Sequence, residues 1–330
     1  MRRKLRALIA ALSLAFVVPA VAWGQRALSV ATLAPAGSQV SRVLNAMNRE
    51  LRRRTAGRVT LRWYMGGVQG DEAEVVRKIR SGRLDGGALS ATGLQHMHRP
   101  VLAFQLPAVF PDAESFLRAY TALRPTLEQG FEHAGFALVH LSPSSGPRMF
   151  STRAIRTPDD LRAARPWQWH DDPILPALYA EAGAQGVALS LPEVLGALQT
   201  RRVDTVFAPP LAAIALQWSP HVRYMSERAA SGSLSALVLS RAAWTSLSEA
   251  DRATLRDVVA QAVTIYRPAI QRAEADALQS LEARGVTTVT LTAAERQRWI
   301  DLFARTRSRL AGTVSDPTWI ARVQAAGRAP

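Results

Sequence analysis

The sequence of 330 residues contains no cysteine. Disulfide bonds are therefore excluded, and so is attachment of a lipid to a cysteine after export. The chain must be held together by burial of its hydrophobic residues, which form 48% of the composition, a share typical of a water-soluble globular protein. The length is sufficient for two domains of ordinary size.

The common catalytic signatures are also missing. The sequence has no G-x-S-x-G, no H-E-x-x-H and no phosphate-binding glycine loop, and it has no cysteine that could serve as a nucleophile. We therefore expect a protein that is not an enzyme and that uses no cofactor. A periplasmic hydrolase is an alternative without a positive feature in the sequence.

Acidic residues are scarce, since 26 Asp and Glu stand against 41 Lys and Arg, for a formal net charge of +15. Four of the cations lie in the first six residues, so the rest of the chain is near +11. The arginines are scattered, and the one tight run, 52–54, ends an expected helix, where cations offset the helix dipole. The charge does not predict a nucleic-acid partner.

The N-terminus predicts export. A basic start, "MRRKLR", precedes the apolar run "ALIAALSLAFVVP", and the small residues of "AVA" suit a signal peptidase. We expect a cleavable signal peptide over residues 1–22, with cleavage after Gly24 as a close rival, and a periplasmic location. An uncleaved membrane anchor is the alternative, although the apolar run is short for a membrane span.

The next part of the chain alternates strands and helices. Strand-like runs begin at 27, 57 and 83, and between them lie helical segments. Ser38 is placed to cap the first helix, and acidic residues occupy the first turn of the second. The order strand, helix, strand, helix, strand favours a parallel sheet covered by helices.

The same order returns from residue 164. "ARPWQW", "GVALS" and "RRVDTVFA" are strand-like, and Asp172 and Pro173 are suited to start the helix between the first two. The ends of the two units also match, "IRSGRLDGGAL" against "LQTRRVDTVFA", with Asp85 and Asp204 at equivalent strand entrances. The repetition predicts two similar α/β lobes with a ligand cleft between the carboxyl ends of their strands.

We expect lobe I to comprise 27–145 plus about 235–275, and lobe II to comprise 146–234 plus about 276–330. The C-terminal part is mostly helical and is expected to cross back over both lobes. Pro268 should kink or break its long helix, and "TAAE" predicts a capping box at the start of a later one.

Six segments in order resemble the extracytoplasmic solute-binding proteins of the tripartite ATP-independent periplasmic (TRAP) transporters, the dicarboxylate-receptor (DctP) type, over about residues 28–305. They are "TLAPAGS", "AGRVTLRWYMGGVQGDEAEVVRKIRSGRLDG", "FQLPAVFPD", "STRAIRTPDDL", "EVLGALQTRRVD" and "WTSLSEADRATLRD". The resemblance implies two α/β lobes that close on a small organic acid and deliver it to a two-part membrane transporter. A ligand sensor or partner protein without transport is an alternative.

The resemblance fails at the expected carboxylate clamp. Where the family has an arginine that grips the ligand carboxylate, this chain has Trp167, and where the family commonly has an asparagine, it has Ala208. A second family arginine corresponds to Arg148 if the alignment has a one-residue gap. The departures predict a solute with apolar or ring character and at most one acidic group. A cationic ligand held by a tryptophan and Asp171 or Asp172 is a weaker alternative.

The stretch "ARPWQWHDDP" holds the clearest candidates. Trp167 and Trp169 should point to the same side of a strand, where they line either the cleft or the core. With Arg148, Phe207, Ala208, Pro209, Ala34 and Ser90 they complete the expected ligand-binding residues. His170, Asp171 and Asp172 are adjacent, but three consecutive residues rarely converge on one metal ion. His96 and His98 have no further ligand nearby in the sequence. No metal is therefore expected.

Overall fold

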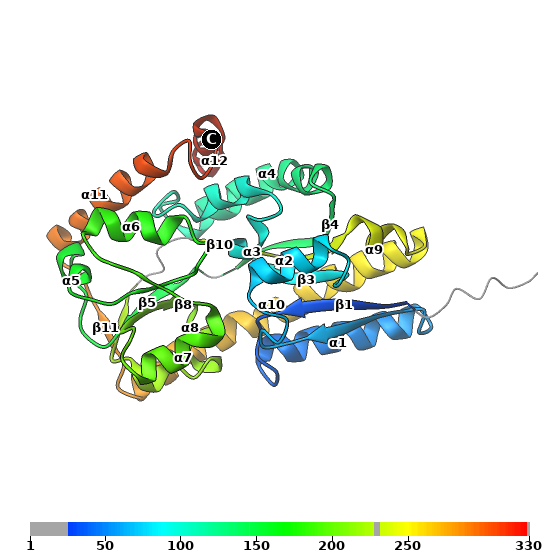
Figure 1. The fold of residues 1–330 in the computed structure, drawn as a ribbon, viewed down its shortest axis with the longest axis horizontal. Coiled ribbons are helices and arrows are strands. Elements are labelled where there is room, and N and C mark those ends of the chain that lie inside the picture. Colours follow the sequence, from blue (N-terminus) through cyan, green and yellow to red (C-terminus); the bar gives the residue numbers. More distant parts are fainter. Residues whose placement is uncertain (1–25, 145, 228–231, 329–330) are drawn as a thin grey trace, which may run out of the picture.

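The computed structural model describes residues 26–144, 146–227 and 232–328 (Figure 1). The predicted signal peptide lies outside these residues. Within the described part of the chain, no helix combines the length and the hydrophobicity needed to cross a membrane.

Lobe I is built on a five-stranded sheet in the order β2-β1-β3-β10-β4. β1 pairs in parallel with β2 and β3, and β10 runs antiparallel to β3 and β4. The strands are β1 (Arg26–Thr32), β2 (Val59–Tyr64), β3 (Gly86–Ser90), β4 (Phe136–Ser144) and β10 (Ser233–Ser240), and the helices are α1 (Gln39–Arg54), α2 (Glu72–Arg80), α3 (Ala91–Leu94), η1 (Arg99–Gln105), α4 (Ala113–His133) and α9 (Arg241–Thr245).

Local sequence signals explain where these elements begin. The Ser38 hydroxyl accepts a hydrogen bond from the Ser41 N–H, which confirms the predicted cap of α1. One face of α1 buries Met47 and Leu51 against the sheet, in a hydrophobic cluster with Leu28 and Val30 of β1. A second cluster on the other face of the sheet includes Val75.

Lobe II has a four-stranded sheet in the order β11-β9-β5-β8 and a separate two-stranded sheet, β6-β7. A single bridge, Pro166↔Thr205, connects the two sheets. The strands are β5 (Arg148–Ser151), β6 (Trp167–Gln168), β7 (Val187–Ala188), β8 (Thr205–Ala208), β9 (Tyr224–Ser226) and β11 (Thr287–Val289), and the helices are α5 (Pro158–Arg162), α6 (Ile174–Ala182), α7 (Leu191–Gln199), α8 (Pro210–Ala215), η2 (Ser219–His221) and α11 (Ala293–Leu310).

The predicted α/β architecture is confirmed, with two refinements. The sheets are mixed rather than mainly parallel, because β10 in lobe I and β5 in lobe II each run antiparallel to their neighbours. The strands expected over 164–169 and 186–190 each shorten to two residues. The predicted helix starts at Asp172 and Thr292 are confirmed, since both side chains accept hydrogen bonds from the first turns of α6 and α11.

The matching aspartates of the two sequence units, Asp85 and Asp204, make matching hydrogen bonds. Asp85 accepts from the Ser29 N–H (2.8 Å) and donates its own N–H to the Ser29 carbonyl (2.9 Å). Asp204 does the same with Arg165, at 2.7 and 3.1 Å. Each aspartate therefore joins the strand it precedes to the first strand of its unit.

The remaining helices connect the lobes. α10 (Glu249–Ala283) packs against α1 of lobe I and α8 of lobe II. The sequence predicts a kink or a break at Pro268, and the break is wrong, because α10 continues through Pro268 as one helix. α12 (Pro317–Gly327) lies against α4 of lobe I (Figure 1). This placement differs from the predicted grouping of 276–330 with lobe II.

Candidate functional site

Several of the predicted ligand-binding residues lie at or next to the ends of strands. The chain crosses from lobe I to lobe II between β4 and β5, so Arg148 follows directly on the crossing. The antiparallel register pairs Arg148 with Ala208 and Met149 with Phe207, which places the end of β8 and Pro209 at the same edge. In lobe I, Ser90 ends β3 beside Ser235 near the start of β10, and Ala34 follows β1.

Arg148 is half-buried and already has protein partners. Its Nη1 donates to the carbonyls of Ser226 (2.8 Å) and Glu227 (2.5 Å) at the end of β9. Burial lowers the pKa of Arg148, against the opposing effect of nearby carboxylates, among them Glu282 and Glu274. The guanidinium therefore faces an acidic neighbourhood, which disfavours a ligand with several negative charges.

Trp167 lies in the core of lobe II. Its side chain is 1% exposed, its indole N–H donates to the Leu189 carbonyl (3.0 Å), and its ring packs against Trp218. Trp169 lies on the same side, as predicted, with ring centroids 5.1 Å apart. Trp169 is only partly buried, and it packs against the same hydrophobic cluster as Trp167 and Ala208. Of the two tryptophans, Trp169 is the one that keeps exposed surface.

On the lobe I side, two acidic residues begin α2. Asp71 caps the helix by accepting from the Glu72 N–H (2.8 Å). Glu72 is buried and accepts from the Ser90 N–H, the Ser90 hydroxyl and the Gly93 N–H. Burial raises the pKa of Glu72 to about 7, although the hydrogen bonds from Ser90 oppose this shift. The Ser90 hydroxyl is thus committed to Glu72.

Ala34 contributes its backbone to a loop. Its carbonyl accepts from the Gly66 N–H (3.0 Å), which holds the segment after β1 against the glycine-rich segment after β2. A Cβ atom at the neighbouring Gly67 would lie 3.2 Å from Cγ of Pro192, at the start of α7 in lobe II. The two lobes therefore touch at this loop.

The lobes also meet at α3. The Gln95 Nε2 donates to the carbonyl of Asp171 (3.2 Å), and Nε2 of His96 lies 3.9 Å from Oδ2 of Asp171. The "HMH" and "HDD" stretches of the sequence thus meet across the lobe boundary through His96 and Asp171. No group of three or more histidine, aspartate or glutamate side chains is suitably placed for a metal ion in the described ranges.

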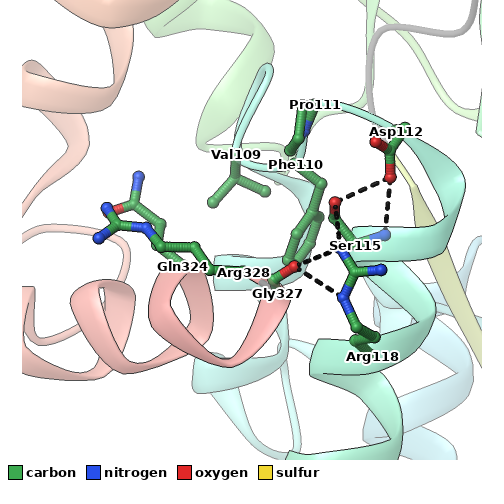
Figure 2. A pocket seen from close by; sticks show the side chains of 9 residues that line it. All are labelled: Val109, Phe110, Pro111, Asp112, Ser115, Arg118, Gln324, Gly327 and Arg328. Carbon is green, nitrogen blue, oxygen red and sulfur yellow. Dashed lines mark hydrogen bonds between the residues drawn. The ribbon is translucent and has the colours of Figure 1, made fainter. Parts of the chain in front are cut away.

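A hollow of about 400 Å³ lies elsewhere, between the start of α4 and the end of α12. Two arginines, Arg118 and Arg328, line it. Figure 2 shows that Arg118 points at Gly327, whose carbonyl accepts from Nε (3.1 Å) and Nη2 (2.9 Å) of Arg118. Arg118 also pairs with Glu114. Its donors serve to hold α12 on lobe I, so this hollow is separate from the predicted ligand-binding residues.

The sequence pattern does not reveal several residues near the contacts between the lobes. It marks Glu72 only as part of an acidic first turn, and it gives no signal for Gln95. Glu274, in the middle of α10, accepts from the Leu211 N–H of α8 (3.1 Å), and burial raises the pKa of its carboxyl. A long helix of mixed polarity carries no local signal for such a contact, because its partner is 63 residues away.

A comparison with protein families identifies the chain. Residues 30–310 match the model of the bacterial extracellular solute-binding proteins, family 7 (DctP). The chain belongs to this family. A solute-binding protein from Verminephrobacter eiseniae (strain EF01-2) is 22% identical over 249 residues, which are 74% of each chain. The predicted family is therefore confirmed, and the members of family 7 are solute-binding proteins rather than enzymes.

Solved structures of related proteins share the fold. The sugar acid binding protein DctPAm from Advenella mimigardefordensis, in complex with galactonate, has a TM-score of 0.85 at 15% identity, over 92% of this chain and 98% of that one. A TRAP periplasmic solute-binding protein from Shewanella oneidensis with bound succinate has a TM-score of 0.84 at 17% identity, over 92% and 99%. One from Ralstonia eutropha H16 with bound (S)-2-acetolactate has a TM-score of 0.82 at 19% identity, over 91% and 98%.

Proposed function

We propose that this family 7 protein is the extracytoplasmic receptor of a TRAP-type transporter, that it captures a small organic solute between its lobes, and that it delivers the solute to a two-part membrane transporter. The observation that carries the proposal is the doubled α/β unit, in which Arg148 pairs with Ala208 in lobe II and Ser90 ends β3 in lobe I. Export to the periplasm belongs to the same proposal, supported by the N-terminal sequence and the family.

The solute we expect has apolar or ring character and at most one acidic group. Arg148 donates to two backbone carbonyls and lies near Glu274 and Glu282, so a second ligand carboxylate would meet repulsion and lose its water without gaining a partner. Trp169, Phe207 and Pro209 are partly exposed and could offer apolar surface to such a solute.

A thermal-shift screen tests the solute class. The solutes bound in structures of similar fold provide the panel. Succinate represents the dianions, galactonate the open-chain anions with one carboxylate, and pyroglutamate and orotate the anions with a ring. A solute present at a hundred times its Kd should add about 2.7 kcal/mol to the free energy of unfolding. A rise with orotate or pyroglutamate and none with succinate is expected. A rise with succinate alone would contradict the proposed solute class.

Small-angle scattering tests the receptor role itself. A solute found in the screen should reduce the radius of gyration, because the lobes close on it. A solute that stabilises the protein without any contraction would favour a rigid enzyme or a sensor with a fixed site.

Arg148→Ala tests the anionic contact. If Arg148 binds the acidic group of the solute, its removal should weaken binding by about 1.5–3 kcal/mol, the worth of a charged hydrogen bond. Titration calorimetry with the solute from the screen measures this. Arg223→Ala is the matched control, because Arg223 is exposed and directly precedes the first residue of β9, whereas Arg148 contacts the end of this strand. Equal affinity of both variants would remove Arg148 from the site.

A further inference from the structure

The segment 171–174 of lobe II reaches onto lobe I through both polar and apolar contacts. The Asp171 carbonyl accepts from the Gln95 Nε2 just after α3. Gln95 is itself only 8% exposed and is fixed by a second hydrogen bond from the same Nε2 to the Thr92 carbonyl (3.0 Å). Its amide is therefore held ready for a partner from the other lobe.

Ile174 supplies the apolar contact. It is 7% exposed and belongs to the hydrophobic cluster of lobe I, together with Leu94 and Met97. Its neighbours along α6, Leu178 and Tyr179, belong instead to a cluster of lobe II. Ala177 also packs against the lobe I cluster, whereas Leu175 packs against the lobe II cluster, so the start of α6 contacts both lobes.

The segment is rigidly connected to lobe II. Asp172 accepts from the Ile174 N–H (2.7 Å) and the Leu175 N–H (3.2 Å), which fixes the start of α6. The Tyr179 hydroxyl donates to the Trp167 carbonyl (2.7 Å), which ties α6 to β6. A movement of lobe II away from lobe I would therefore pull Asp171 from Gln95 and Ile174 from its cluster together.

We propose that residues 171–174 form a closure clasp: they hold lobe II against lobe I and set the ratio of open to closed receptor. The inference rests on the proposed closure of the lobes, but it assigns this task to residues other than the expected ligand-binding ones. The protein would then be partly closed by its own contacts, and a solute would add to that closure.

The absence of cysteine makes a direct test possible. Leu117→Cys on α4, where the native side chain is 43% exposed, and Gln199→Cys at the exposed end of α7 place one spin label on each lobe. Pulsed electron spin resonance on the labelled protein, without any solute, then reports the distribution of distances between the lobes. Because no solute is used, failure to find one would not affect the measurement.

Two variants remove the two contacts separately. Gln95→Met removes the amide donor and keeps the length of the side chain, and Ile174→Ala removes the apolar contact. In each, we expect the ratio of open to closed molecules to rise about three- to tenfold, the effect of losing one modest contact. Leu178→Ala, one turn along α6 and buried within lobe II, is the matched control and should keep the parent distribution.

The clasp is overturned if Gln95→Met and Ile174→Ala leave the distance distribution unchanged, or if Leu178→Ala shifts it as much as they do. A shift in Ile174→Ala alone would refute the assigned role of Gln95. If Ile174→Ala fails to fold, Gln95→Met decides the matter, because it removes only the amide contact and leaves the hydrophobic cluster intact.

Discussion

Lobe I and lobe II follow the same chain path, but their first strands are held in different ways. In lobe I, β1 pairs with β3 through three successive residues, Val30–Thr32. In lobe II, the equivalent contact between β6 and β8 is one bridge, Pro166↔Thr205. Lobe II compensates with side chains, since Trp167 packs between Trp169 and Trp218. A fold can therefore be repeated while backbone pairing is exchanged for aromatic packing.

The largest effect should come from removing that packing. Trp167→Ala is expected to lower the free energy of unfolding by about 3–5 kcal/mol, as for other buried tryptophans. Trp169→Ala, two residues along and partly exposed, should cost less than half as much. Urea unfolding measures both. A smaller loss for Trp167→Ala than for Trp169→Ala would mean that Trp167 is not a core residue.

The equivalent aspartates offer the next comparison. Asp204 is almost fully buried and accepts from the Arg165 N–H, whereas the side chain of Asp85 is 20% exposed. Asp204→Ala should cost about 2–3 kcal/mol and Asp85→Ala about 1 kcal/mol, because the N–H left without a partner is harder for water to reach in lobe II. Urea unfolding of the two variants under identical conditions is the measurement, and equal losses would contradict the difference between the lobes.

Each lobe has a carboxyl whose pKa is raised by burial, and the two carboxyls should affect stability over different ranges of pH. Burial raises the pKa of Glu72 in lobe I to about 7 and that of Asp172 in lobe II to about 6. The folded protein then holds protons that the unfolded chain has lost, so stability falls as pH rises through about 4.5–7 for Glu72 and about 4–6 for Asp172.

In Glu72→Gln, the free energy of unfolding should no longer fall between pH 6 and 7. The fall below pH 6 that Asp172 contributes should remain. The lost slope amounts to roughly 1 kcal/mol for that unit of pH. Thermal unfolding followed at pH 5, 6 and 7 measures the slope independently of the absolute stability of the variant. An unchanged slope between pH 6 and 7 would show that Glu72 is ionised throughout.

The smallest effect concerns the turns before the matched strands. Gly82 in lobe I has φ +72°, and Arg201 at the equivalent position in lobe II has φ +58°. Arg201→Gly relieves the backbone strain but increases the conformational entropy of the unfolded chain, so we expect the free energy of unfolding to rise by at most about 0.5 kcal/mol. Gly82→Arg should lower the free energy of unfolding by about 1 kcal/mol, and urea unfolding measures both changes. Losses in both directions would show that the two turns are not equivalent.

The repeat could be predicted because both copies keep local signals. Asp85 and Asp204 precede matching strands, and the caps Ser38, Asp172 and Thr292 act on N–H groups within three residues. Family membership also followed from segments that keep their order. The length of the strands could not be predicted, since "ARPWQW" has the composition of a strand and pairs over only two residues.

The sequence by itself determined the helix starts, the doubled unit and the shared side of Trp167 and Trp169, because these depend on neighbours in the chain and on the two-residue period of a strand. Only the tertiary structure decided that Trp167 is enclosed, because Trp218 covers it from 51 residues away. It also decided that α12 returns to lobe I and that Gln95 meets Asp171. Such contacts depend on how whole lobes pack, and no period or cap in the sequence encodes them.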